Sequence, residues 1–362
     1  MAEPLKHMYS PTRIQTLAHE IQKVHKKFEM NEFLSEFKTK KWNEAELNER
    51  VKIISESIHK HLNLEFKDAV EVLIPASYRV PTGYFSIFFP DFVWRYGLND
   101  FETSMRALEE FTKTSSGEFA IRHFIRDYPD RTMKRMLKWS KSGNVHIRRL
   151  SSEGCRPKLP WGMQLKPFVA DPSPILPILE MLKDDPELYV RKSVANNLND
   201  ISKDHPDLVL DLAERWIGKS ESTDWIIQHA LRTLLKSGNK RALSLFGHHD
   251  AGGISVGDLQ VTPKKVSIGD SMTFSFSVRN ETKKNRECRI EFAVDYLRER
   301  GTHSRKVFQV SKVNLKEQRI EFRKKLSFAD LTTRKHYPGA HKLHVIINGE
   351  VKSSLDFRLV AD

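Results

Sequence analysis

Cysteine is nearly absent from this chain of 362 residues, which contains only Cys155 and Cys288. Two distant thiols support neither a disulfide framework nor a zinc ribbon, and they are typical of a reducing cytoplasm. Long apolar runs are missing too, because charged residues interrupt every hydrophobic stretch. We therefore expect no transmembrane helix and no membrane partner. The N-terminal segment lacks the apolar core of a secretory signal, so we expect no export.

The motifs of several common chemistries are also missing. The 16 glycines form no phosphate cradle, and no Walker-type loop, GxGxxG, HExxH or GxSxG occurs. The 15 histidines are scattered, and no pair has the spacing of metal ligands. Clustered carboxylates for a two-metal nuclease are not evident either. We therefore expect no metal and no cofactor.

Positive charge is in excess, and the excess is uneven. The chain has 60 Lys and Arg against 47 Asp and Glu, a net charge of +13. Residues 251–362 hold 22 basic and 13 acidic residues, a surplus of nine. A basic module of this kind indicates a polyanionic partner. Charge alone also permits a solvated surface tuned for solubility.

The period of the apolar residues changes near residue 250. Up to about residue 246 it is helical, with amphipathic helices predicted at 16–28 and 43–61 and a break predicted by Pro75, Pro81, Gly83 and Pro90. Beyond Gly252-Gly253 it becomes two, as in residues 272–278, which predicts strands. Asn348-Gly349 predicts a hairpin turn. We therefore expect a helical domain over 1–248 and an immunoglobulin-like sandwich over 254–362.

A weak internal repeat runs through the helical part. Four expected helices begin with an apolar residue followed by a basic or polar one, at Arg122, Arg148, Arg191 and Gln228. The offsets are irregular, and the longest insertion runs from Cys155 to Pro174. Stacked HEAT-type hairpins tolerate such insertions in their loops. The predicted fold is mainly α, a HEAT-like helical-repeat solenoid followed by an all-β immunoglobulin-like sandwich.

Candidate site residues gather where a carboxylate stands among basic residues. Glu153 is flanked by Arg148, Arg149, Arg156 and Lys158. The pattern by itself also permits a simpler interpretation, in which Glu153 is only a salt-bridge partner of these arginines.

The next repeat carries a second carboxylate in a similar setting. Asp200 follows Arg191 and Lys192 along one expected helix. If the helices stack in parallel, Glu153 and Asp200 lie at similar heights on one face. Asp200 can equally be a residue at a helix end, and Trp161, which follows a proline-stiffened turn, can serve packing alone.

Three segments, residues 115–122, 152–161 and 190–203, resemble the bacterial AlkC family of DNA alkylation repair glycosylases. The likeness covers about residues 1–246, and the sandwich resembles the immunoglobulin-like extension of some members. The resemblance implies a monofunctional glycosylase that hydrolyses the N-glycosidic bond of cationic N-methylated bases, 3-methyladenine and 3-methylcytosine, in duplex DNA. It implies a bacterial cytoplasmic protein held near the nucleoid by DNA. Nothing in the sequence indicates an oligomer, so we expect a monomer.

Site residues follow from the same resemblance. The implied catalytic residues are Glu118, Glu153, Trp161 and Asp200. The implied DNA-facing residues are Arg148, Arg149, Arg156, Lys158, Arg191 and Lys192. We also expect the basic cluster 283–286 or the basic cluster 323–325 of the sandwich to contact the DNA backbone. The alternative is a non-enzymatic HEAT-repeat scaffold that binds nucleic acid or protein and is indifferent to Glu153→Gln.

Overall fold

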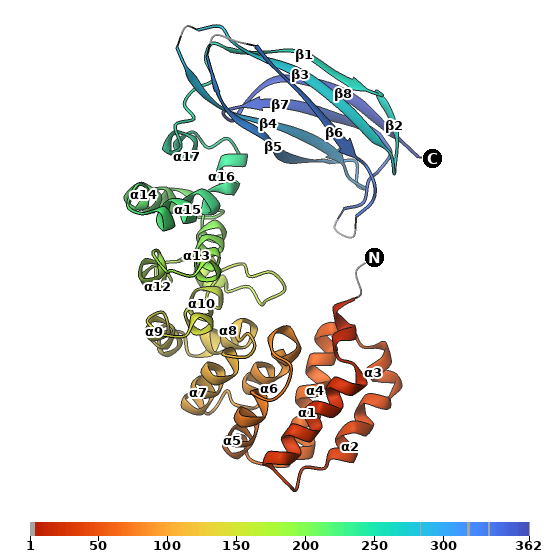
Figure 1. The fold of residues 1–362 in the computed structure, drawn as a ribbon, viewed down its shortest axis with the longest axis vertical. Helices are drawn as coiled ribbons and strands as arrows, with labels where there is room; N and C mark the ends of the chain where they lie inside the picture. The colour runs from red at the N-terminus through yellow and green to blue at the C-terminus, as the bar shows by residue number, and fades with distance from the viewer. Residues whose placement is uncertain (1–3, 283, 317–318, 332–333, 362) are drawn as a thin grey trace. The chain divides into compact units, whose positions relative to one another are not determined.

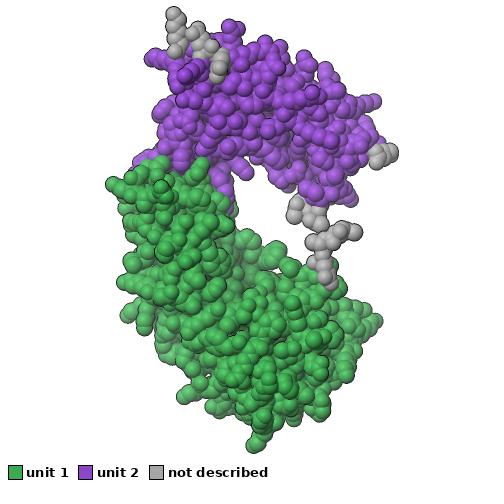
Figure 2. Space-filling view, in the orientation of Figure 1, with its two compact units in different colours: residues 1–209, 215–230 green, residues 210–214, 231–362 purple. Residues whose placement is uncertain are grey.

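The computed structural model describes residues 4–282, 284–316, 319–331 and 334–361. Helices come first and strands second, in agreement with the predicted fold class (Figure 1). The chain forms two compact units, residues 1–209 with 215–230 and residues 210–214 with 231–362 (Figure 2). No helix in the described ranges is both long and apolar enough to span a bilayer.

The first helices of the chain cover its N-terminal third. They are α1 (Pro11–Val24), α2 (Met30–Ser35), α3 (Lys40–Glu44), α4 (Leu47–Leu62), α5 (Phe66–Ser77), α6 (Phe88–Tyr96) and α7 (Phe101–Thr112), with 3-10 turns η1 (Leu5–Met8), η2 (Glu36–Lys38) and η3 (Gly83–Ile87). The helices predicted at 16–28 and 43–61 are α1 and α4. Helix α1 begins earlier than predicted, because Ser10 caps it and Pro11 takes its first position.

The predicted break lies between α5 and α6, where Pro81 and Gly83 stand, but Pro75 and Pro90 lie inside the two helices. Pro90 is the third residue of α6, where the N–H of any other residue would have no intrahelical partner. Pro75 lies in the last turn of α5, two residues before the helix ends. Pro90 therefore removes no hydrogen bond from α6, whereas Pro75 removes one near the end of α5.

The helical repeats follow α7. The four predicted helix starts, Arg122, Arg148, Arg191 and Gln228, lie on α8 (Glu118–Asp127), α10 (Val145–Glu153), α13 (Leu188–Ile201) and α15 (Glu221–Ala230). The other helices here are α9 (Pro129–Trp139), α11 (Lys166–Ala170), α12 (Leu176–Leu182) and α14 (Pro206–Trp216). Helix α10 packs against α13, and α13 against α15. Figure 1 shows α9 and α12 on the opposite side of the stack from α10 and α13. We call α8, α10 and α13 the inner helices.

The second unit contains two short helices and two β-sheets. The helices are α16 (Arg232–Lys236) and α17 (Lys240–Leu245). One sheet has the order β1-β3-β6, from β1 (Ile254–Thr262), β3 (Ser271–Asn280) and β6 (Arg319–Ser327). The other has the order β2-β8-β7-β4-β5, from β2 (Lys265–Ser267), β8 (Glu350–Val360), β7 (Gly339–Ile347), β4 (Arg286–Leu297) and β5 (His303–Leu315).

Alternation along the strands builds the core of the sandwich. Met272, Phe274, Phe276 and Val278 of β3 are all buried, as the period-two pattern predicts. The predicted hairpin turn joins β7 to β8, and its residues Asn348 and Gly349 have φ of 47° and 81°. These positive values explain why Asn and Gly occupy the turn.

Candidate active site

The three carboxylates predicted for the site lie on the three inner helices. Glu118 begins α8, Glu153 ends α10, and Asp200 lies in the last turn of α13. All three are buried, with exposed fractions of 9%, 6% and 2%. A buried carboxylate is costly unless it is paired, so the partners of these side chains determine whether the arrangement is stable.

Arg156 joins the two carboxylates of neighbouring repeats. Its Nη1 donates to Glu153 Oε1 at 2.7 Å, and its Nε donates to Asp200 Oδ2 at 2.9 Å. Lys203 Nζ donates to the other oxygen of Asp200 at 2.9 Å, and Ser193 Oγ donates to Glu153 Oε2 at 2.7 Å. The structure therefore brings Glu153 and Asp200 together around one guanidinium.

Arg149 extends the same network to the third carboxylate. Its Nη1 donates to Glu118 Oε2 at 3.0 Å, and its Nη2 lies 3.6 Å from Glu153 Oε1. Ser116 Oγ accepts a bond from Arg149 and also bonds Glu118. The carboxylates and arginines thus alternate in a continuous series, Glu118–Arg149–Glu153–Arg156–Asp200, which we call the carboxylate network.

The carboxylates of the network raise the pKa of both of its arginines. Burial would lower the pKa of the Arg149 guanidinium, but the charges of Glu118 and Glu153 raise it above its ordinary value. Glu153 and Asp200 likewise raise the pKa of Arg156 against the effect of burial. The result is fixed, desolvated charge on rigid helices. In the described residues, no group of three His, Cys, Asp or Glu could hold a metal ion.

Trp161 is placed differently from the carboxylates. It lies in the loop that follows α10, has a φ of 63° and is 76% exposed. A large aromatic ring that is this exposed does not serve core packing, so the interpretation of Trp161 as a packing residue is wrong. Its backbone conformation is rare for a residue with a side chain, which indicates that the loop is held by other contacts.

Arg122 of α8 holds that loop. The side chain is completely buried, and its Nη1 donates to the carbonyls of Gly154 at 2.9 Å and Arg156 at 2.7 Å. Its Nε donates to the carbonyl of Met163 at 2.7 Å. Burial lowers the pKa of Arg122 to about 10, which leaves it charged at neutral pH. Arg122 therefore ties together both ends of the segment that carries Arg156 and Trp161.

We predict that Arg122→Met lowers the free energy of unfolding by about 3 kcal/mol, because three buried carbonyls lose their donor. Urea titration followed by circular dichroism measures the change. Arg126→Met is the matched control on the same helix, since Arg126 is exposed and pairs with Asp127. Equal unfolding free energies for the two variants would contradict the role of Arg122 in holding the loop.

Three of the four remaining predicted cations have partners outside the carboxylate network. Arg148 donates to both oxygens of the buried Asp185, at 2.6 and 3.1 Å. Arg191 donates to the backbone carbonyls of Asp185 and Pro186, each at 2.7 Å. Lys158 pairs with Asp204, whereas Lys192 is exposed and makes no ion pair among the described residues. Arg148 and Arg191 therefore hold the starts of α10 and α13.

Sequence reasoning missed several residues that complete the site. Ser116 and Ser193 bond the carboxylates, and Asp185 anchors the repeat arginines. Arg122 was noted only as a repeat marker. Ser193 lies 40 positions from Glu153, and Ser116, although it is two positions from Glu118, lies 33 positions from its other partner Arg149. Because serine forms no recognisable motif here, nothing in the local pattern distinguishes either residue.

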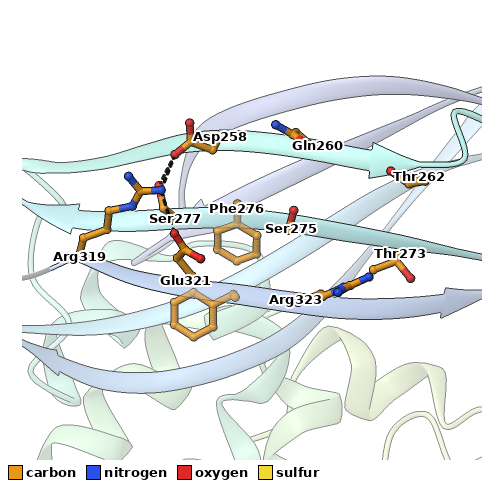
Figure 3. A pocket seen from close by; sticks show the side chains of 11 residues that line it. Asp258, Gln260, Thr262, Thr273, Ser275, Phe276, Ser277, Arg319, Glu321 and Arg323 are labelled. Carbon is orange, nitrogen blue, oxygen red and sulfur yellow. Dashed lines mark hydrogen bonds and ion pairs between the residues drawn. The ribbon is translucent and has the colours of Figure 1, made fainter.

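The outer face of the β1-β3-β6 sheet contains a hollow of about 420 Å³ (Figure 3). The hollow is lined by Thr273, Ser275 and Ser277 of the central strand β3, and their small side chains leave the space open. At one end Arg319 pairs with Asp258 and Glu321. Arg323 lines the hollow without an ion pair among the described residues. Of the two basic clusters predicted here, 323–325 is on β6, while Lys283 lies outside the described residues.

The fold and the site together define the class of protein. Its first part is a stack of helical repeats that holds a buried carboxylate network, and its second part is an immunoglobulin-like sandwich. The family model described as DNA alkylation repair enzyme matches residues 101–234. The model described as the C-terminal Ig-like domain of uncharacterised protein YhaZ matches residues 255–361.

Two proteins resemble the whole chain. The uncharacterized protein YhaZ of Bacillus subtilis is 44% identical over 356 residues, which cover 98% of this chain and 99% of that protein. The alkylpurine DNA glycosylase AlkC of Pseudomonas fluorescens, solved bound to DNA containing an abasic site analog, is 40% identical, with a TM-score of 0.95 and coverage of 99% and 100%. The chain belongs to the AlkC-type family of DNA alkylation repair glycosylases. It is an enzyme, and the alternative of a non-enzymatic scaffold no longer applies.

Proposed function

We propose that the chain is a monofunctional glycosylase that hydrolyses the N-glycosidic bond of cationic N-methylated bases, 3-methyladenine and 3-methylcytosine, in duplex DNA. The observation that carries the proposal is the carboxylate network, in which Glu118, Glu153 and Asp200 are buried on rigid helices. The DNA partner is supported by the complex of the AlkC relative with DNA that contains an abasic site analog.

The chemistry of these lesions matches a site without a strong general acid. Methylation at N3 places a positive charge on the base, so the base departs without being protonated by the enzyme. As the bond to C1′ breaks, positive charge develops on the sugar. Fixed carboxylates near that centre stabilise the developing charge electrostatically, and their cost of desolvation has already been met in the folded protein.

Glu153 is the carboxylate that we assign to the attacking water. Each of its oxygens accepts one bond, from Arg156 or from Ser193. A carboxylate oxygen has two lone pairs, so both atoms retain the capacity to accept a bond from water. The water oxygen bonds to C1′, and its proton passes through Glu153 to solvent. Asp200 and Glu118 then act by charge, and Trp161 lies against the deoxyribose or the cationic base.

Lys203 is the one lysine bonded to the carboxylate network among the described residues, and it does not suit nucleophilic attack. Its Nζ donates to Asp200 Oδ1 at 2.9 Å. A lysine ammonium held in such an ion pair has no lone pair with which to attack C1′. We therefore propose that the product is an abasic site in an uncut strand.

The experiment that tests the proposal uses the full chain and duplex DNA that carries 3-methyladenine. Released base is measured by chromatography, and the strand is examined before and after treatment with alkali. We expect free base from the wild type and strand breaks only after alkali. Failure of the folded protein to release a base from duplexes carrying either 3-methyladenine or 3-methylcytosine would contradict the proposed activity.

Exposed cations supply the proposed contacts with the DNA backbone. Arg148 and Arg191 are occupied by protein partners and Lys158 pairs with Asp204, so in the helical part we assign a phosphate contact to the exposed Lys192. In the sandwich we assign them to the exposed residues Arg323 and Lys325 of β6. Such contacts position a duplex without reading its sequence, as repair of randomly placed lesions requires.

We predict that Arg323→Glu with Lys325→Glu weakens DNA binding and flattens its dependence on salt. Loss of two phosphate contacts lowers the slope of log K against log salt by about 1.8. Fluorescence anisotropy at several salt concentrations measures this slope. The control is Lys134→Glu with Lys138→Glu on α9, which makes the same change of charge at exposed positions. An unchanged slope in the β6 variant would remove the sandwich from the proposed interface.

A further inference from the structure

A pocket of about 200 Å³ lies in the first unit beside the carboxylate network. Five ring side chains line it: Tyr84, Trp94, Phe119, His123 and Trp161. Each of them keeps part of its surface exposed, although rings of this size are ordinarily buried in a core. Aromatic faces gathered around a small pocket are typical of a site that binds a flat, ring-shaped ligand.

The charged groups of the pocket are already neutralised by one another. Asp91 accepts from Arg95 Nε at 2.6 Å and from Trp94 Nε1 at 2.8 Å, and the guanidinium of Arg95 lies 4.5 Å above the Trp94 ring. The ring of His123 stacks on Trp94 at 3.8 Å between centroids. Burial lowers the pKa of His123 to about 4, so the imidazole is neutral at physiological pH. The pocket as a whole carries no net charge from these groups.

His123, which lines the pocket, has one ring nitrogen that is unsatisfied within the part of the chain that the structure describes. The Nδ1 atom of His123 is buried and makes no hydrogen bond among the described residues. Unpaired buried nitrogens are uncommon in folded proteins, and a ligand that bonds to one removes the cost of its burial. Heterocyclic bases carry both donors and acceptors on their ring edges, so they can complement a neutral imidazole in either tautomer.

The pocket begins where the carboxylate network ends. Ser116 lines the pocket, and its hydroxyl also accepts the bond from Arg149 at 2.8 Å. Phe119 lines the pocket and directly follows Glu118 on α8. Trp161, which we placed against the reacting nucleotide, is part of the pocket wall as well. A molecule that leaves the carboxylate network on this side enters a ring-lined and uncharged space.

We propose that this pocket binds the neutral methylated purine that the reaction releases. The inference rests on the proposed function, because hydrolysis changes the charge of the base. Water bonds to C1′, the C1′–N bond breaks, and its electron pair passes to the ring and cancels the positive charge. The freed base is then no longer attracted to Glu118, Glu153 and Asp200, and it gains stacking contacts in the aromatic pocket. The pocket is thus an exit site for product, which free base can occupy and so inhibit the enzyme.

The test measures binding of free 3-methyladenine to the full chain without DNA, by equilibrium dialysis. We expect saturable binding to the wild type and to Glu153→Gln, and about tenfold weaker binding to Tyr84→Ala and to Phe119→Ala. Tyr78→Ala is the matched control, because Tyr78 is exposed and lies outside the pocket. We expect 1-methylnicotinamide, a permanently cationic flat heterocycle, to bind at least tenfold more weakly than 3-methyladenine.

Each outcome separates the exit site from the glycosylase itself. Because dialysis needs no catalysis, binding that depends on Tyr84 and Phe119 shows that the pocket holds the free base, and failure of base release from DNA would then overturn its role as an exit site together with the proposed function. No saturable binding by the wild type, or equal binding by the Tyr84 and Tyr78 variants, overturns it while base release can still be shown. Equal affinity for the cationic heterocycle overturns the preference for a neutral product.

Discussion

Glu153→Gln should lower the rate of 3-methyladenine release at least a hundredfold, while the fold and the affinity for DNA remain close to those of the wild type. The expected size follows from removing one preorganised charge from a desolvated site, which costs about 10²–10³ in rate. The amide keeps the shape of the side chain, and its oxygen can still accept from Arg156 or Ser193. What it loses is the negative charge beside C1′ and the capacity to take a proton from water.

Single-turnover release from a 3-methyladenine duplex measures this effect, and anisotropy with undamaged duplex measures binding. Glu110→Gln on α7 is the matched control, since Glu110 pairs with Lys113 outside the carboxylate network. We expect Asp200→Asn to lose activity as well, because its carboxylate completes the charge around Arg156. Wild-type rates in both network variants would assign these carboxylates to packing alone and leave the mechanism without its charge.

The fold could be predicted because its two periods are strong. The alternation in β3 and the turn at Asn348-Gly349 are local signals, and each follows from side-chain direction or backbone sterics alone. Pro75 and Pro90 were wrongly predicted to break helices, because the effect of a proline depends on its position within a helix. Pro90 is harmless in the first turn of α6, and a pattern of apolar residues does not place that first turn to within a residue or two.

Only part of the site could be predicted, because many of its contacts join residues that are far apart in the sequence. Glu153 and Asp200 stand at related positions of successive repeats, so stacking predicts that they approach each other. The partner of Arg148 is Asp185, 37 positions further on, and no local pattern identifies it. Arginines of similar appearance therefore divide into two roles: Arg149 and Arg156 pair with the candidate catalytic carboxylates, whereas Arg148 and Arg191 hold helix starts.

The exposed ring of Trp161 shows a different limit. Its conformation depends on Arg122, a buried cation whose three bonds reach carbonyls of a distant loop. Backbone carbonyls carry no sequence signature, because every residue has one. The sequence can therefore mark Arg122 as part of a repeat, but only the folded chain shows that it positions Arg156 and Trp161.

Arg156→Met should be the most destabilising single change in the network. It removes the guanidinium between Glu153 and Asp200 and leaves two buried carboxylates without their shared counter-charge. Breaking a buried ion pair from one side costs about 3–5 kcal/mol. Urea titration at pH 8 measures the loss. The control is Arg241→Met, because Arg241 pairs with Asp211 and Glu214 at the surface and should have little effect.

The pH dependence of Arg156→Met distinguishes lost charge from lost packing. Without the guanidinium, the folded variant gains by protonating a buried carboxylate, so its carboxyl pKa lies above the value in the unfolded chain. Such a group favours folding as the pH falls, and the gap between variant and wild type should therefore be smaller at pH 5 than at pH 8. Adding Glu153→Gln to Arg156→Met should recover part of the lost stability at pH 8, because Glu153 then no longer places a buried charge beside Asp200, which keeps its ion pair with Lys203. A deficit that is the same at both pH values, and that the second substitution does not reduce, would mean that Arg156 contributes volume rather than charge to the carboxylate network.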